Sequence, residues 1–125
     1  MRQPVSTTAA LIVGLAGATA VVFGAFGAHA LRGVLDERGL DLWRTAVNYH
    51  FWHALALALI AFTASPGRPR RIALPAFAIG IVLFSGSLYA LALGAPRLIG
   101  LITPLGGVAF IVGWIALGFA LRQKD

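Results

Sequence analysis

Four long stretches of this 125-residue chain carry no charged side chain. Their lengths are 29, 23, 25 and 24 residues, and they run over residues 3–31, 45–67, 72–96 and 98–121. A transmembrane helix needs about 20 consecutive, mostly apolar residues to cross the hydrocarbon core of a bilayer. The pattern therefore predicts four spanning helices, at residues 7–31, 43–64, 72–94 and 103–121.

The composition also favours lipid over water as the solvent. Hydrophobic residues make up 59% of the chain and charged residues 11%, whereas soluble domains carry about 25% charged residues. A barrel strand would alternate polar and apolar residues, and the apolar run at 54–61 does not. We expect an all-α membrane protein in which residues 1–125 form one domain, a compact bundle of four transmembrane helices with short loops.

The first connection, residues 31–41, is the only long polar one, and it has two interpretations. Leu31, Val34, Leu35 and Leu40 would form the apolar side of a short interfacial helix. The alternative is a plain loop. Trp43, just beyond this connection, is expected in the aromatic belt at the membrane surface. All six prolines are expected near span ends, with Thr103 as the N-cap before Pro104.

The basic residues give an orientation. The termini and the middle loop share one side with six of them, and the opposite side holds four: Arg32, Arg38, Arg44 and Arg97. Cytoplasmic loops of membrane proteins carry an excess of Lys and Arg, so both termini are expected in the cytoplasm. The net charge of +6 suits anionic lipid headgroups at the membrane edges. No nucleic-acid partner is indicated.

The absence of buried acids limits the chemistry. No Asp or Glu occurs from Leu42 to Lys124. Proton relays and cation sites inside membranes use such carboxylates, so neither a carboxylate relay nor a charge-driven pump is expected. The chain contains no cysteine, which excludes disulfides and thiolate nucleophiles.

Histidine is the remaining candidate for a site. His50 and His53 lie one turn apart on the second span, and His29 ends the first span on the same side of the membrane. Three imidazoles near one surface would suit zinc or copper, and they would also titrate near neutral pH. The alternative is structural hydrogen bonding to carbonyls or to neighbouring hydroxyl groups. Candidates for a ligand or polar cluster are His29, Tyr49, His53, Ser85, Ser87 and Tyr89.

The third span contains the most polar run, residues 84–89. A serine nucleophile there would need an activating base, and no Gly-x-Ser-x-Gly elbow is present. Serine hydroxyls in helices commonly bond back to the preceding turn. We therefore expect no enzymatic activity, no catalytic residue and no cofactor.

Several motifs resemble one known family. They are GAFGAH at 24–29, Tyr49 with HALA at 53–56, FSGSLYALAL at 84–93, TPLGG at 103–107 and Gly113-Trp114. In order and over nearly the whole chain, they resemble domain-of-unknown-function family 423, which is itself similar to eukaryotic transmembrane protein 256. The resemblance implies a small bacterial inner-membrane protein with about four helices. His50 stands where the family pattern has Gln, which weakens a three-histidine metal site and leaves His29, Tyr49 and His53 as shared residues.

Three functions follow as expectations. The first is a non-enzymatic membrane component that binds lipid or a partner helix, because small residues recur every four positions along each span. The second is an oligomeric transport or channel subunit lined by Asn48, Ser85, Ser87 and Thr103. The third is a metal or proton site built from His29, His50 and His53. The expected partners are membrane lipids, a second copy or another membrane protein.

Overall fold

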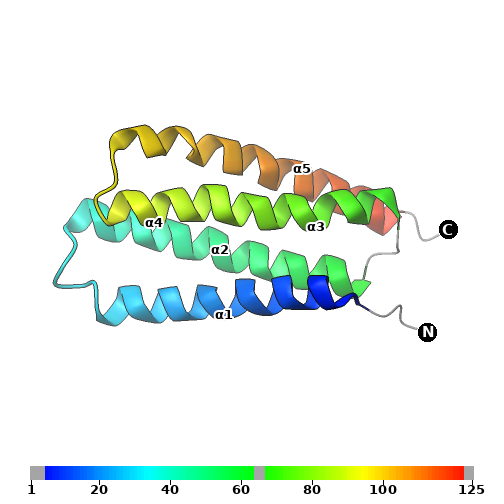
Figure 1. Cartoon of the computed structure of the whole chain (residues 1–125), viewed down its shortest axis with the longest axis horizontal. Helices are drawn as coiled ribbons and strands as arrows, with labels where there is room; N and C mark the ends of the chain where they lie inside the picture. Colours follow the sequence, from blue (N-terminus) through cyan, green and yellow to red (C-terminus); the bar gives the residue numbers. More distant parts are fainter. Residues whose placement is uncertain (1–4, 64–66, 123–125) are drawn as a thin grey trace.

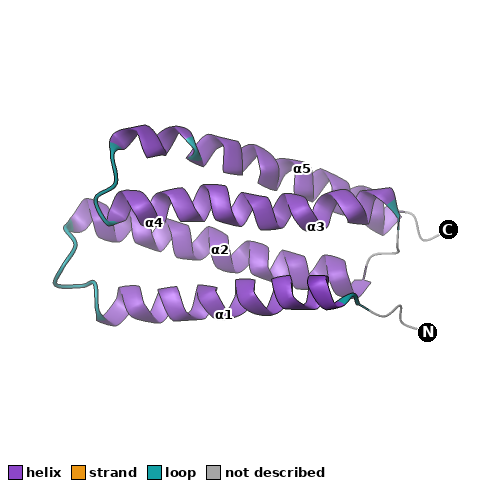
Figure 2. Ribbon diagram, viewed as in Figure 1, coloured by secondary structure: helices purple, strands orange, loops and turns teal. Residues whose placement is uncertain are grey.

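A computed structural model describes residues 5–63 and 67–122 of the chain, and Figures 1 and 2 show that these residues are almost entirely helical. Five α-helices follow in order: α1 (Thr7–His29), α2 (Glu37–Thr63), α3 (Arg68–Gly80), α4 (Gly86–Ala92) and α5 (Thr103–Arg122). A π-helical segment, Ile81–Ser85, joins α3 to α4, so that they form one continuous span. A short 3₁₀ turn, Arg97–Leu101, precedes α5.

The prediction of four spanning helices is confirmed. The four candidate spans are Thr7–His29, Glu37–Phe62, Arg68–Ala92 and Arg97–Arg122. α1 begins and α5 ends at the same end of the bundle, as four successive crossings require (Figure 1). The opposite end carries the α1–α2 and α4–α5 connections, and we call it the loop end. Arg2 and Lys124, used above for the orientation, lie outside the described residues, so the cytoplasmic termini stay a prediction.

The spans pack in chain order. α1 packs on α2, α2 packs on the span formed by α3 and α4, and α3 packs on α5 (Figure 1). The main core lies where α2, α3 and α5 meet. Its buried members are Ala56, Leu57, Ile60, Ala73, Phe77, Ile81, Phe110, Ala116, Leu117 and Ala120.

α1 lies at the edge of the bundle. Only Ala9, Ala20 and Gly27 of this helix are buried. Large apolar side chains such as Leu11 and Val21 are about 60% exposed. In water such a surface would be costly, but against lipid tails it needs no protein cover. The side of the bundle around α1 therefore suits a hydrocarbon solvent.

Glycine and phenylalanine pair reciprocally between α3 and α5. A Cβ on Gly113 would overlap the ring of Phe77, and a Cβ on Gly80 would overlap the ring of Phe110. Each helix thus provides a ring and the space for its neighbour's ring. Gly86, a small residue of the third span, does not mark a close helix contact of this kind, because a Cβ there would meet nothing within 4 Å.

The first connection is a loop, which decides between its two interpretations. Residues 30–36 form turns, in which Leu35 N–H donates to the carbonyl of Leu31 at 3.1 Å. α2 then begins at Glu37, six residues earlier than predicted. Asp36 starts this helix, because its carboxylate accepts a hydrogen bond from Gly39 N–H at 2.7 Å. The charged residues that follow extend α2 beyond the apolar span.

Two expectations about helix starts are wrong. Pro75 lies inside α3 because this helix begins at Arg68 and not at residue 72. Pro69 occupies the first turn instead, where a missing N–H costs nothing. Thr103 is the first residue of α5 and its hydroxyl lies 2.5 Å from Ser87 Oγ. No N-cap bond from this side chain is found in the described part of the chain.

Candidate functional site

His50 connects three spans through its two ring nitrogens. Its Nε2 lies 3.0 Å from Thr19 Oγ1 on α1, and its Nδ1 lies 2.9 Å from Tyr89 Oη on α4. The side chain is 3% exposed. The helix rise places His50 about 9 Å beyond Arg44, within the apolar part of the span. We call Thr19, His50 and Tyr89 the His50 chain.

The hydrogen bonds assign the tautomer of His50. Thr19 has one hydroxyl hydrogen, and it is directed to the carbonyl of Leu15, 2.6 Å away. His50 Nε2–H therefore donates to Thr19, which leaves Nδ1 to accept from the Tyr89 hydroxyl. Every polar group of the His50 chain then has a partner with the imidazole neutral, as a low-dielectric environment requires.

Aromatic rings surround this chain toward the loop end. The ring centroids of Trp43 and Tyr89 lie 4.5 Å apart, and those of Phe23 and Tyr89 lie 5.0 Å apart. Trp43 is 6% exposed and donates its indole N–H to the carbonyl of Phe23 at 2.8 Å. The expectation that Trp43 belongs to a lipid-facing belt is wrong, because Gly27 leaves room for the indole between α1 and α2.

His53 has the opposite tautomer and different partners. Its Nδ1 lies 2.7 Å from the carbonyl of Tyr49, and Trp114 on α5 donates its indole N–H to His53 Nε2 at 3.0 Å. Nδ1 must therefore carry the proton. The ring also stacks on Phe110, with centroids 3.6 Å apart and planes 9° apart. We call His53, Tyr49, Phe110 and Trp114 the His53 cluster.

The serine hydroxyls also have partners inside the protein. Ser85, in the π-helical segment, donates to the carbonyl of Ala46 on α2 at 2.7 Å. Ser87 donates to the carbonyl of Phe84 at 2.9 Å, so that Thr103 donates to Ser87 Oγ. These contacts join the third span to α2 and to the start of α5. Within residues 5–63 and 67–122, neither serine hydrogen-bonds to a histidine or a carboxylate.

The three histidines do not converge. His29 is exposed at the end of α1, while His50 and His53 direct their rings to different spans. No group of three His, Cys, Asp or Glu side chains able to hold a metal ion occurs within residues 5–63 and 67–122. The arrangement matches the structural hydrogen-bonding alternative, with no three-histidine site formed. Of the predicted cluster, Tyr49 joins His53, and Tyr89 joins His50.

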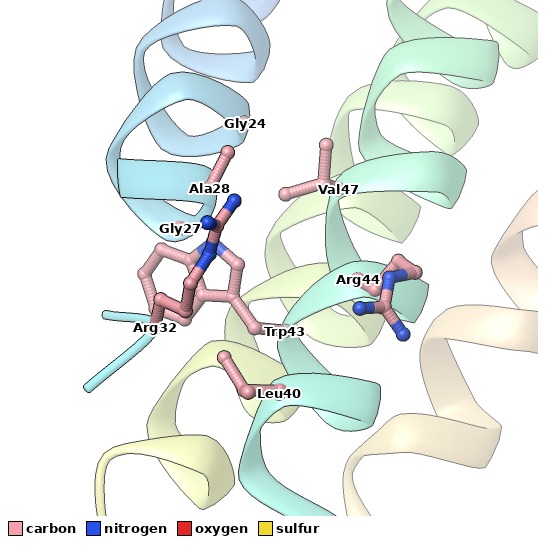
Figure 3. Close-up of a pocket in the computed structure, with 8 residues that line it drawn as sticks. All are labelled: Gly24, Gly27, Ala28, Arg32, Leu40, Trp43, Arg44 and Val47. Atoms are coloured by element: carbon pink, nitrogen blue, oxygen red, sulfur yellow. The ribbon is translucent and has the colours of Figure 1, made fainter. Parts of the chain in front are cut away.

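A crevice between α1 and α2 opens at the loop end, and Figure 3 shows it. Its volume is about 320 Å³. Its walls are apolar apart from two arginines: it is lined by Gly24, Gly27, Ala28, Arg32, Leu40, Trp43, Arg44 and Val47. We call it the arginine crevice.

The two arginines differ in their contacts. In Figure 3 the Arg32 side chain lies over the crevice beside the Trp43 indole, and Arg44 lies on the α2 side. Arg44 pairs with Asp41 at 3.0 Å, and both side chains are about two-thirds exposed. No ion pair of Arg32 is found among the described residues. The arginine crevice therefore offers an available guanidinium above an apolar floor.

Reasoning from the sequence missed several of these residues. Thr19 and Trp114 complete the hydrogen bonding of the two histidines, and Arg32 lies over the crevice. The one available signal was polarity, since Thr19 is the only hydroxyl residue between Thr8 and Arg32. Nothing in the local pattern indicates which span it faces.

Comparison with known proteins places the chain among bacterial membrane proteins. A family model described as "Protein of unknown function (DUF423)" matches residues 23–107. The chain belongs to the DUF423 family. The match runs from Phe23 to Gly107, so it includes His50, His53, Tyr89 and every residue that lines the arginine crevice.

Relatives of this DUF423 protein cover most of its length. UPF0382 membrane protein YwdK of Bacillus subtilis is 49% identical over 102 residues, which is 78% of this chain and 82% of the relative. A UPF0382 membrane protein of Haemophilus influenzae is 40% identical over 86% of this chain and 88% of its own. UPF0382 inner membrane protein YgdD of Escherichia coli is 37% identical over 91% and 89%. No solved structure matches.

Together with the four spans, these relatives confirm a multi-pass protein of the bacterial inner membrane. The names of the relatives state a location and no activity. The function must therefore be argued from the geometry of the site.

Proposed function

We propose that this protein is a non-enzymatic lipid-binding component of the inner membrane, and that the arginine crevice holds the phosphate of an anionic phospholipid. The observation that carries the proposal is Arg32, a guanidinium without an ion pair in the described residues that lies over an apolar crevice. A phospholipid has the matching chemistry, since its phosphate is anionic and its chains are apolar.

The position of the crevice supports a lipid as the occupant. It lies at the loop end, where the charge-free spans give way to charged residues. Phosphate groups lie at this depth in a bilayer, and an arginine can bind a phosphate through two parallel hydrogen bonds. The floor beneath, formed by Gly24, Ala28 and Val47, would contact the upper part of an acyl chain.

The pair of Arg44 with Asp41 does not oppose this arrangement. An exposed ion pair contributes only about 0–1 kcal/mol, so Arg44 can leave Asp41 for a phosphate at low cost. Asp36 and Glu37 also lie at the loop end, but neither lines the crevice. The lining therefore carries basic side chains and no acidic one.

The polar groups in the spans support a binding role over catalysis. The imidazoles of His50 and His53 use both ring nitrogens, and Ser85 and Ser87 donate to backbone carbonyls. A nucleophile or general base needs a free lone pair in reach of a substrate. Because the histidines and serines already have hydrogen-bond partners within the protein, they give little support to a metal or proton site or to a pore lined by these serines.

Lipid titration tests the proposal. The protein is placed in neutral phosphatidylcholine nanodiscs, phosphatidylglycerol is added stepwise, and binding is followed by native mass spectrometry. We expect Arg32→Gln to lower the affinity for phosphatidylglycerol about tenfold, because a hydrogen bond to a charged group contributes about 1.5–3 kcal/mol. Arg38→Gln, at the same end but outside the crevice, is the matched control. Equal affinities in all three proteins would refute the assignment.

A further inference from the structure

One face of α2 is covered by no other helix in the part of the chain that the structure describes. Its exposed positions include Asp41, Thr45, Asn48, Trp52 and Leu55, whose spacing alternates between four and three residues. This spacing places all five on one stripe along the helix. The exposed fractions of Trp52 and Leu55 are 53% and 57%. We call this stripe the α2 seam.

Asn48 is the unusual member of the α2 seam. It lies four residues beyond Arg44 in the direction of the membrane centre, or about 6 Å by the helix rise. The side chain is exposed, and its carboxamide has no hydrogen-bond partner in the described part of the chain. Lipid tails offer neither donors nor acceptors, so an unpaired amide there is costly. By contrast Ser85, Ser87 and Thr103 all have partners inside the protein.

We propose that the α2 seam is covered by the α2 seam of a second copy of this chain, with Asn48 hydrogen-bonded to Asn48 of that copy. A second copy inserted with the same topology presents each residue at the same depth. A two-fold axis normal to the membrane then brings Asn48 opposite its own counterpart. A carboxamide has both a donor and an acceptor, so two of them can pair through two hydrogen bonds.

The neighbours of Asn48 fit this arrangement. The four–three spacing is that of left-handed helix pairs, which cross at about 20° in membranes. An asparagine in such a seam fixes the register of the two helices. At the loop end, Asp41 and Arg44 lie one turn apart with opposite charges. Each Arg44 can therefore meet the second copy's Asp41 across the same axis.

A second copy accounts for these features better than a lipid does. Lipid tails would cover Leu55 but would leave the amide of Asn48 unpaired. A lipid headgroup at the surface would meet Arg44 but would lie about one helical turn from Asn48. A partner that offers a hydrogen-bond donor and an acceptor at the same depth satisfies Asn48, and Asn48 of a second copy offers both.

Cysteine cross-linking in native membranes tests the seam. The chain has no cysteine, so single variants report single positions. Thr45→Cys and Leu55→Cys probe the seam, while Leu11→Cys and Ile111→Cys probe exposed lipid-facing positions of α1 and α5. After oxidation with copper phenanthroline, we expect a disulfide-linked dimer from both seam variants, at a yield at least fivefold above the two controls.

The role of Asn48 is tested in the same variants. We expect Asn48→Leu to reduce the dimer yield severalfold and Asn48→Gln to retain it, since Gln keeps the donor and the acceptor. Thermal unfolding in detergent checks that Asn48→Leu leaves the monomer folded. The proposal is overturned if the seam and control positions cross-link equally, if Asn48→Leu dimerises like its parent, or if the seam cross-links only to a protein of another mass. None of these outcomes depends on lipid binding by Arg32.

Discussion

The indole N–H of Trp114 donates to Nε2 of His53 at 3.0 Å, which joins the fourth span to the second at a buried imidazole. The other ring nitrogen is held by the carbonyl of Tyr49 at 2.7 Å. A histidine fixed at both nitrogens is a structural connector between helices. Its counterpart, His50, joins α2 to α1 and α4 in the same way.

Loss of the Trp114 hydrogen bond should destabilise the bundle. In Trp114→Phe the ring still contacts Phe77, but His53 Nε2 has no donor and is left buried. Hydrogen bonds between membrane helices contribute about 0.6 kcal/mol on average and up to about 1.7 kcal/mol, so we expect a loss of about 1 kcal/mol in the free energy of unfolding. The measurement is reversible unfolding in detergent micelles. Phe119→Leu, exposed on the same helix, is the control, and an equal loss in both variants would contradict the role of Trp114.

Two substitutions of His50 should show whether its role is to donate one hydrogen bond and accept another. His50→Leu leaves the Tyr89 hydroxyl without an acceptor and Thr19 without a donor, so we expect a loss of about 1–2 kcal/mol. His50→Gln can still accept from Tyr89 and donate to Thr19, and its loss should be below about 0.5 kcal/mol. Unfolding in micelles compares the two. If Gln proves as harmful as Leu, the His50 chain depends on imidazole for more than one donor and one acceptor.

A methyl group at residue 27 should displace the Trp43 indole. In Gly27→Ala the new Cβ overlaps the indole ring, so Trp43 must move and its bond to the Phe23 carbonyl is lost. Overpacking of this kind costs about 1–3 kcal/mol. Thermal unfolding gives the stability, and the tryptophan emission maximum reports the change around Trp43.

Gly17→Ala is the matched control on the same helix. A Cβ at Gly17 meets nothing within 4 Å. Alanine is favoured over glycine inside a helix by about 0.5–1 kcal/mol, so this variant should be neutral or slightly more stable. Similar destabilisation by both substitutions would mean that glycine is needed along α1 for a reason other than space for Trp43.

The spans could be predicted from the sequence because charge marks their ends. The first span was expected at 7–31 and is found at Thr7–His29. In the fourth span a helix was expected at 103–121, and α5 is found at Thr103–Arg122. The second begins early because helix continues through its charged first turns, which lie beyond the apolar stretch. A charge pattern reports where lipid ends, and a helix need not end there.

The partners of the histidines could not be predicted in this way. His50 and His53 are three residues apart, so their side chains point about 60° apart around α2. That angle is enough to direct His50 to α1 and α4 and His53 to α5. Which span lies in each direction depends on the packing of distant helices, which the spacing within one helix does not contain. Thr19 and Trp114 were missed for this reason.

The ring nitrogens of the two buried histidines, His50 and His53, give the most direct test of the account. In this account the polar groups of the spans hold the helices together, and neither of these two imidazoles is free to bind metal or transfer protons. Solid-state ¹⁵N NMR of histidine-labelled protein in lipid bilayers reports the protonation of each nitrogen, with His50→Gln used for assignment. We expect two neutral rings of opposite tautomer, with the proton on Nε2 in His50 and on Nδ1 in His53, and no change in either ring on adding zinc. An imidazolium signal from either residue at neutral pH, or a zinc-induced shift of its ring nitrogens, would contradict the account.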